Sequence, residues 1–112
     1  MKKDDLVYAG HMLDTARSIV AKMHGVDREK FDGDENLRLA VTHLIQIIGE
    51  AAARVSDDFR GAHHDIPWRA IVGMRQKIVH DYVYINYDIV WDVASTQLDT
   101  LITQLEAIVP EA

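Results

Sequence analysis

The sequence predicts an all-α protein, folded as an antiparallel, up-and-down bundle of four helices. Apolar residues recur every three or four positions along several long segments, which is the spacing of a helix with one buried face. The connections between these segments are short, and the sequence contains no repeat, no low-complexity tract and no parallel-sheet pattern. Because the chain has 112 residues, we expect a single domain over residues 1–112.

The first predicted helix runs from about Asp4 to His24. Its apolar positions follow helical spacing and comprise Leu6, Ala9, Gly10, Leu13, Ala16 and Val20. The stretch from Gly25 to Asp34 carries two glycines and five charged residues before Asp34, so we expect a loop. Asp34 is a candidate N-cap for the next helix.

The second predicted helix is the best core helix of the chain, at roughly twenty residues. Its wide apolar face is formed by Leu37, Ala40, Val41, Leu44, Ile45, Ile48, Ala51, Ala52 and Val55. On the opposite side, His43, Gln46, Glu50 and Arg54 form a polar stripe. This stripe is either a solvated face or a second interface, in which Glu50 would pair with Arg75 of the same or a neighbouring chain.

Two further helices complete the predicted bundle. The run from Ser56 to Gly61 has room for one short turn, and Asp65-Ile66-Pro67 resembles a helix start. We expect the third helix over Pro67 to Asp81, then a connector through Asn86, which would cap the last helix. The last helix buries Val90, Ala94, Leu98, Leu101, Leu105 and Ile108, and Pro110 ends it. Gly49 and Gly73, each inside a predicted helix, suggest close helix contacts.

Composition restricts the possible functions. With 48% hydrophobic and 27% charged residues, the chain is typical of a globular protein. Its net charge of -6 argues against broad, sequence-independent binding of nucleic acid, but it allows a small, focused contact with RNA. The absence of cysteine rules out disulfides and a cysteine nucleophile. Because no signal sequence or membrane span is evident, we expect a cytoplasmic protein.

The strongest candidate for chemistry is the run Gly73-Met74-Arg75-Gln76-Lys77-Ile78-Val79-His80-Asp81-Tyr82. On an ideal helix, Arg75 would project from the middle of an apolar stripe and would need an anionic partner or a wet cleft. Arg75 and Tyr82 would share a face, whereas His80 would point about 140° away from Arg75. His80 therefore meets Arg75 only if the helix ends or loosens near His80, or if two chains face each other.

An arginine and a histidine are a sensible minimum for cleaving RNA without a metal. Imidazole can accept the proton of a ribose 2'-hydroxyl or donate one to the leaving 5'-oxygen, and guanidinium can neutralise charge on the phosphorane. The motif supplies one histidine per chain, whereas an acid and a base need two. The nuclease hypothesis therefore predicts a dimer.

Other interpretations of these residues are simpler. An Arg-to-His spacing occurs by chance in many chains, and Tyr82 by itself suggests a core aromatic residue with its hydroxyl at the rim. His63-His64-Asp65 has the residue types of a metal site, but adjacent histidines before a helix are usually solvated. The chain lacks a phosphate-binding Gly-rich loop with Lys-Ser or Lys-Thr, and it lacks Gly-x-Ser-x-Gly.

The surroundings of the motif resemble a known family. Four segments carry the resemblance: Ile48-Gly49-Glu50-Ala51-Ala52, Ile66-Pro67-Trp68, Gly73-Met74-Arg75 with Val79-His80-Asp81-Tyr82, and Asp88-Ile89-Val90-Trp91. In this order, they are similar to the HepT branch of the HEPN superfamily, also called the domain of unknown function 86 group. The similarity covers nearly the whole chain.

The resemblance implies a homodimeric helical bundle that acts as a metal-independent endoribonuclease, the toxin of a two-gene toxin-antitoxin system. It assigns catalysis to Arg75 and His80. It also implies that a minimal nucleotidyltransferase antitoxin attaches AMP to Tyr82, which would fill and neutralise the cleft that RNA must enter. The position after the motif arginine is often Asn in this family, and Gln76 stands there instead.

We therefore expect RNA, a second copy of the chain and the nucleotidyltransferase as partners, with no membrane, no DNA, no metal and no other cofactor. Gln76 and Glu50 are the expected supporting residues. A non-catalytic module that docks with a nucleotidyltransferase, or presents substrate to it, is the alternative, because the same bundle would serve it. A purely structural dimerisation bundle is a third hypothesis, but it leaves the position of Arg75 unexplained.

Overall fold

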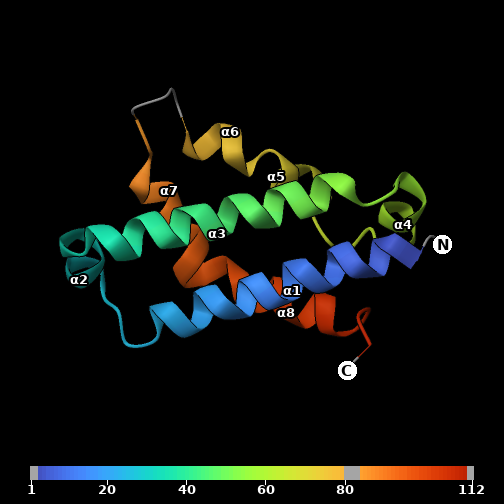
Figure 1. Ribbon diagram of the computed structural model, residues 1–112, viewed down its shortest axis with the longest axis horizontal. Helices are drawn as coiled ribbons and strands as arrows, with labels where there is room; N and C mark the ends of the chain where they lie inside the picture. The colour runs from blue at the N-terminus through green and yellow to red at the C-terminus, as the bar shows by residue number, and fades with distance from the viewer. Residues whose placement is uncertain (1–2, 80–83, 111–112) are drawn as a thin grey trace.

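The computed structural model describes residues 3–79 and 84–110, and its helices form the predicted antiparallel bundle (Figure 1). Four helical arms alternate in direction. The arms are α1 (Lys3–Met23), α3 (Glu35–Arg54), α5 (Trp68–Val72) with α6 (Met74–Ile78), and α7 (Tyr87–Asp92) with the π-helical turn η1 (Val93–Gln97) and α8 (Leu98–Glu106). The short helices α2 (Arg28–Gly33) and α4 (Asp57–Ala62) lie in the connections.

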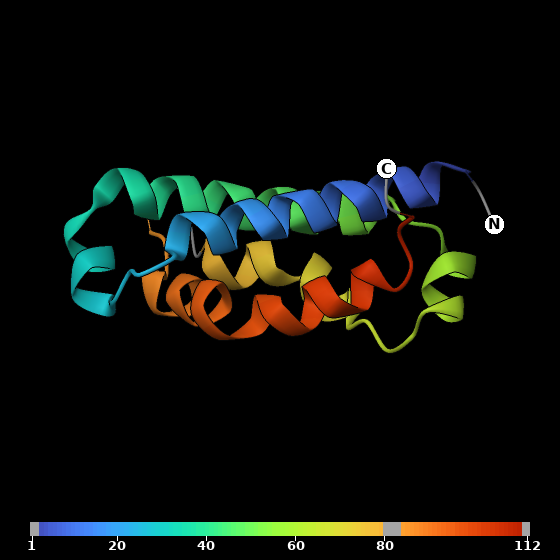
Figure 2. The same cartoon turned by 90° about the horizontal axis from the view of Figure 1, so that it is seen from below.

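The four arms form two layers, with α1 and α3 in one layer and the other two arms beneath them (Figure 2). α3 is the central element, because it packs against α1, α5, α6 and α7. α8 packs against α1 and closes the other side. This confirms the predicted all-α class and the role of the second predicted helix as the core helix.

Buried aliphatic and aromatic side chains fill the space between the layers. The largest fully buried side chains are Phe31, Phe59, Met12, Ile19, Ile66, Ile78, Leu105, Val41, Val90 and Asp5. The apolar members on α1, α3 and α8 follow the apolar spacing of the sequence, because each of these helices turns its apolar stripe inward. No described helix combines the length and the apolar character that crossing a membrane requires.

The predicted helix starts are largely confirmed by their caps. Asp34 accepts a hydrogen bond from the backbone nitrogen of Leu37, at 3.0 Å, and so begins α3. The side chain of Asn86 accepts from Asp88 and Ile89 and begins α7. The start of the third arm differs slightly from the other helix starts. Pro67 itself is the N-cap of α5, and no side chain accepts a capping hydrogen bond there.

One buried acid joins the first and second arms. Asp5 is only 2% exposed, and its two carboxylate oxygens accept hydrogen bonds from the backbone nitrogen of Ser56 at 2.8 Å and its hydroxyl at 2.6 Å. The same hydroxyl oxygen accepts a bond from the backbone nitrogen of Phe59 and caps α4. Charge-assisted bonds of this kind fix the turn after α3, which leads toward α5.

The prediction of a loop over residues 25–34 is wrong in one respect, because this stretch contains α2. Asp27 caps this helix, and Phe31 is completely buried. A single apolar residue among charged ones gives no helical period, so the sequence pattern missed the element. Tertiary burial of Phe31 stabilises α2 instead.

Candidate active site

α5 and α6 carry Arg75, and buried residues at both ends hold them to the core. Trp68 is 6% exposed, and its indole nitrogen donates to the carbonyl oxygen of His63 at 3.0 Å. Ile78 at the other end is fully buried. Arg75 therefore lies on a short helical segment that is fixed at each end.

The helical arm breaks at Gly73, between α5 and α6. The backbone nitrogen of Gly73 donates to the carbonyl of Arg69 at 3.0 Å, and the carbonyl of Gly73 accepts from Gln76 at 3.2 Å, three residues on. A side chain at Gly73 would lie 3.2 Å from the carbonyl of Arg69, within its own arm. The prediction that Gly73 permits a close contact between helices is therefore wrong, because the nearest atoms belong to its own arm.

The expected close contact is confirmed at Gly49 of α3. A Cβ atom there would lie 3.2 Å from the backbone carbonyl oxygen of Ile71 and 3.9 Å from that of Val72. The end of α5 thus lies directly on the backbone of α3. A side chain at this position would require the neighbouring backbone to shift by a few tenths of an ångström, so glycine suits this close approach.

Arg75 lies on the surface of α6, just after Gly73. An unbroken helix would put Arg75 in the middle of the apolar stripe, but Arg75 is exposed. The sequence predicted that Arg75 would need an anionic partner or a wet cleft, and its exposed position leaves the guanidinium open to solvent. The guanidinium remains hydrated and pays no cost of burial.

The predicted helix from Pro67 to Asp81 also ends early, at Ile78. Val79 is extended, with φ -100° and ψ 102°, and it pairs with Ile85 in an antiparallel bridge. The backbone nitrogen of Asn86 donates to the carbonyl of Ile78 at 2.8 Å. The helix thus ends before His80, which is the condition under which the imidazole can leave the ideal helical track. His80 and Tyr82 themselves lie outside the described residues.

A clamp of charged and aromatic residues holds the start of α7, directly after this segment. Arg28 donates to Asp32 at 2.9 Å and to Asp88 at 2.6 Å, and its guanidinium lies 5.9 Å from the ring centre of Trp91. The hydrogen bonds to Asp88 and then to Asp32 raise the pKa of Arg28 above its usual value. Arg28 therefore keeps its positive charge at any physiological pH.

Arg38 of α3 completes this clamp from the other side. Its guanidinium donates to the carbonyl oxygens of Phe31, at 3.1 Å, and of Asp32, and it lies 5.0 Å from the ring centre of Tyr87. The ring centre of Phe31 lies 5.3 Å from that of Trp91. Sequence reasoning missed this arrangement, because its members come from three separate segments.

The supporting residues named from the sequence are on the surface. Gln76 and Lys77 are exposed beside Arg75, and Glu50 is exposed on α3. Within the part of the chain that the structure describes, ion pairs involve Arg17 and Arg28, and none joins Glu50 to Arg75. The pairing of Glu50 with Arg75, in the same or a neighbouring chain, stays a prediction.

A largely apolar hollow of about 420 Å³ is lined by residues of α3, of the third arm and of the arm formed by η1 and α8. Ile45 and Ile48 of α3, Ile71 and Met74 of the third arm, and Leu101 of α8 are among its lining residues. Arg75 follows Met74 directly in sequence but does not line this hollow. The described part of one chain thus presents Arg75 on an open surface and not inside an apolar pocket.

The histidine pair before α5 has structural contacts. The ring centre of His63 lies 4.6 Å from that of Phe59, and the backbone carbonyl of His63 holds Trp68. His64 and Asp65 are exposed. Among residues 3–79 and 84–110, no group of three or more acidic or histidine side chains is arranged to hold a metal ion.

A family model described as ribonuclease HepT-like matches residues 12–108. This range includes α3, both halves of the third arm and the whole motif from Arg75 to Tyr82. The chain belongs to the HepT-like ribonuclease family. The resemblance predicted from the four sequence segments is therefore confirmed, together with the ribonuclease class of enzyme.

Several proteins are similar to this HepT-like chain over most of its length. A protein named "Putative RNase" from Caldanaerobacter subterraneus subsp. tengcongensis is 33% identical over 101 residues, 90% of each chain. Another with the same description, from Methanocaldococcus jannaschii, is 27% identical over 98% of this chain and 91% of its own length. A "Probable ribonuclease HepT" from Thermococcus cleftensis is 33% identical over 65% of this chain and 66% of its own. No solved structure gives a significant match.

Family membership gives the motif a structural context. Asp88 and Trp91, two residues of the fourth matching segment, are held by Arg28 in the clamp. Gly49, in the first segment, is where α5 meets α3. In this HepT-like chain, these two segments thus fix the backbone on both sides of residues 80–83.

Proposed function

We propose that the chain is a metal-independent endoribonuclease, the toxin of a HEPN/nucleotidyltransferase toxin-antitoxin system. One observation carries most weight within a HepT-like chain: α6 ends at Ile78, two residues before His80, with Arg75 exposed on its surface. The exposed cation Arg75 is accessible to a polymer such as RNA. We propose a cytoplasmic location, because the RNA and ATP are found there.

The proposed reaction is attack of a ribose 2'-oxygen on the adjacent phosphorus. A bond forms between the 2'-oxygen and phosphorus, and the bond from phosphorus to the 5'-oxygen breaks. One imidazole takes the 2'-hydroxyl proton, and an imidazolium gives a proton to the 5'-oxygen. Arg75 neutralises the charge that builds on the phosphorane. The products are a 2',3'-cyclic phosphate and a 5'-hydroxyl.

This reaction needs an acid and a base, so we propose that His80 acts from two chains of a homodimer. The exposed position of Arg75 supports this, since a single described chain leaves the guanidinium without an anionic partner or cleft. A second copy of the chain, related by a two-fold axis, would supply the other side of the cleft and the second imidazole. Gln76, which is exposed next to Arg75, would orient a phosphate.

Purified protein should cut RNA in the presence of EDTA and leave 2',3'-cyclic phosphate ends. The physical reason is that protonation of imidazole and the charge of guanidinium replace a metal in every step. Gel analysis of a labelled RNA, with and without kinase treatment of the ends, measures both results. Cleavage that requires added divalent metal would contradict the mechanism.

We propose that the partner nucleotidyltransferase silences the toxin by attaching AMP to Tyr82. The tyrosine oxygen attacks the α-phosphorus of ATP, its proton passes to a base, and pyrophosphate leaves. Each adenylate then adds a bulky anion close to Arg75 in sequence, which would repel RNA.

Intact mass after incubation with the nucleotidyltransferase and ATP should rise by whole AMP units. Tyr82→Phe should show no such increase, because a phenyl ring offers no oxygen for the new bond. Tyr84→Phe is the matched control, since Tyr84 is an exposed tyrosine two residues away. An unchanged mass gain in Tyr82→Phe would move the modification elsewhere. Modification without any RNA cleavage would favour the non-catalytic binding module.

A further inference from the structure

Backbone hydrogen bonds connect Arg75 to the start of α7. The backbone nitrogen of Val79 donates to the carbonyl oxygen of Arg75 at 2.9 Å. Val79 then pairs with Ile85 in the antiparallel bridge. The backbone nitrogen of Asn86 donates to the carbonyl oxygen of Ile78 at 2.8 Å. Because Asn86 also caps α7, a movement of the α7 start would be passed to the end of α6.

Two arginines join the α7 start to α2, at the same end of the bundle (Figure 1). Arg28 of α2 donates to Asp88 at 2.6 Å, and its guanidinium lies 5.9 Å from the ring centre of Trp91. Arg38 of α3 donates to two carbonyl oxygens of α2, and its guanidinium lies 5.0 Å from the ring centre of Tyr87. The two arginines therefore fix the α7 start against α2.

The pair of Arg28 with Asp88 acts locally, because it lies at the surface. Their side chains are 40% and 84% exposed, and exposed ion pairs contribute little to the global free energy of folding. Arg28 also donates to Asp32, at 2.9 Å, so one guanidinium holds two carboxylates together. Without it, the two carboxylates would repel each other, and the α7 start would move away from α2 while the buried core stayed intact.

We propose that Arg28 and Arg38 are positioning residues of the ribonuclease. By fixing the α7 start, they fix the end of α6, so that Arg75 stays where charge develops on the phosphorane. Neither arginine touches the RNA or the reacting atoms. Because a displacement of about 1 Å can cost as much as about 100-fold in rate, a clamp at the surface can change kcat without changing global stability. This role rests on the proposed ribonuclease function and names residues that support its site.

Arg28→Met in the intact chain tests this role, because it removes the cation and keeps an unbranched stem. We expect kcat for RNA cleavage to fall by about 3- to 30-fold, with KM within about 2-fold of the wild type and the thermal midpoint unchanged. In hydrogen exchange followed by NMR, the amides of Val79 and Asn86 should exchange about 3- to 10-fold faster, whereas that of Ile45 in α3 should not change. Arg28→Lys should recover part of kcat, because lysine keeps the charge but lacks the rigid fork.

Two further variants remove contacts of the same clamp. Asp88→Ala should match Arg28→Met, and the double variant should lose no more activity than either single variant, because both remove one contact. Arg38→Met should lower kcat and speed exchange at Val79 and Asn86 in the same way.

Arg17→Met is the matched control. Among the described residues, Arg17 also forms a long-range ion pair, with Glu106 at 2.7 Å, and the two side chains are 47% and 48% exposed. This pair joins α1 to α8 and not to α7. The variant should leave kcat and the exchange of both amides unchanged.

Either of two results in Arg28→Met or Arg38→Met would overturn the role of that arginine. The first is a wild-type kcat, or wild-type exchange at Val79 and Asn86. The second is a raised KM with an unchanged kcat, which would mean that the arginine contacts RNA directly. RNA cleavage by the wild type in these cases would leave the proposed function intact. A wild type that cuts no RNA would instead refute the proposed function, and the positioning role with it.

Discussion

His80→Ala should lower kcat for RNA cleavage by about 10²- to 10⁴-fold, which is the usual contribution of general acid-base catalysis. Arg75→Ala should lower it by about 10²- to 10³-fold, because the phosphorane loses its fixed cation. Both variants should keep the stability of the wild type, since Arg75 is exposed and α6 ends before His80. Initial rates on a labelled RNA, together with thermal unfolding, measure these effects. Expression of either variant should permit growth where the wild type arrests it.

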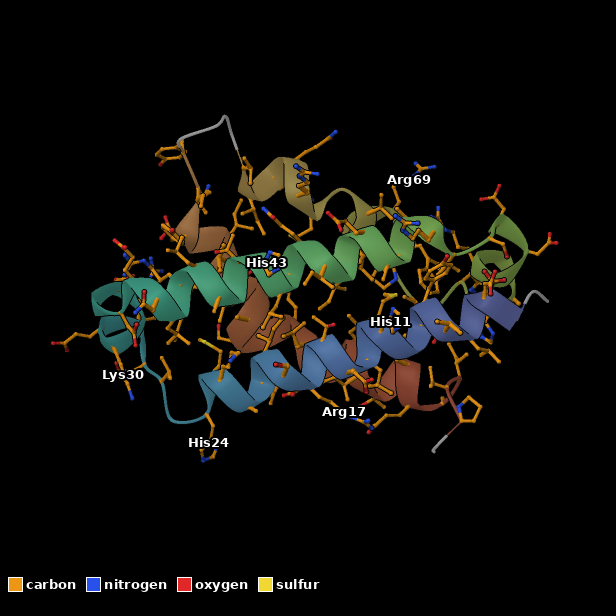
Figure 3. All side chains as sticks on the ribbon, in the orientation of Figure 1. His11, Arg17, His24, Lys30, His43 and Arg69 are labelled. Carbon is orange, nitrogen blue, oxygen red and sulfur yellow. The ribbon has the colours of Figure 1, made fainter. Side chains whose placement is uncertain are left out.

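His24→Ala is the control for the loss of an imidazole. His24 is exposed beyond the end of α1 and points away from the bundle (Figure 3), so its removal should leave the rate unchanged. Mixing wild type with His80→Ala tests the pooled site, provided that the subunits exchange. If both imidazoles act in one site, an equal mixture retains about a quarter of the activity, against about half for independent chains. Equal rates in His80→Ala and wild type would remove His80 from the mechanism.

Gly49→Val should destabilise the fold by about 1–3 kcal/mol, the typical cost of overpacking. A Cβ atom at this position already lies 3.2 Å from the carbonyl oxygen of Ile71, and valine adds two carbons against the same backbone. Urea unfolding should show the loss as a lower midpoint. At a temperature where the variant remains folded, kcat should also fall, because α5 and α6 carry Arg75 and must move away from α3.

Gly10→Val is the matched control, since Gly10 is also a helical glycine. The nearest atom to a Cβ at Gly10 is a side-chain carbon of Val109 at 3.9 Å, which is ordinary contact. Its stability should stay within about 1 kcal/mol of the wild type, because valine has the better helix propensity. If Gly49→Val were as stable as Gly10→Val, α5 would not lie directly on α3.

Individual residues show how far the sequence could predict this structure. Asp34 and Asn86 cap helices as expected, because a cap depends on a short-range bond to a backbone nitrogen two or three residues on. Phe31 was missed because its burial depends on α7, far along the chain. Ile78 ends its helix earlier than predicted, since Val79 pairs with Ile85 across the connector.

For the motif of Arg75, His80 and Tyr82 too, some features follow from the sequence and others only from the tertiary structure. The sequence by itself determined the residue types, their order, the helical bundle and the family, because apolar periodicity and motif spacing are local properties of the chain. Only the tertiary structure decided that Arg75 is exposed and that the helix ends before His80. The end of the helix depends on a contact between separate segments, the hydrogen bond from Asn86 to Ile78. A helical period assumes that the helix continues, and this contact ends it.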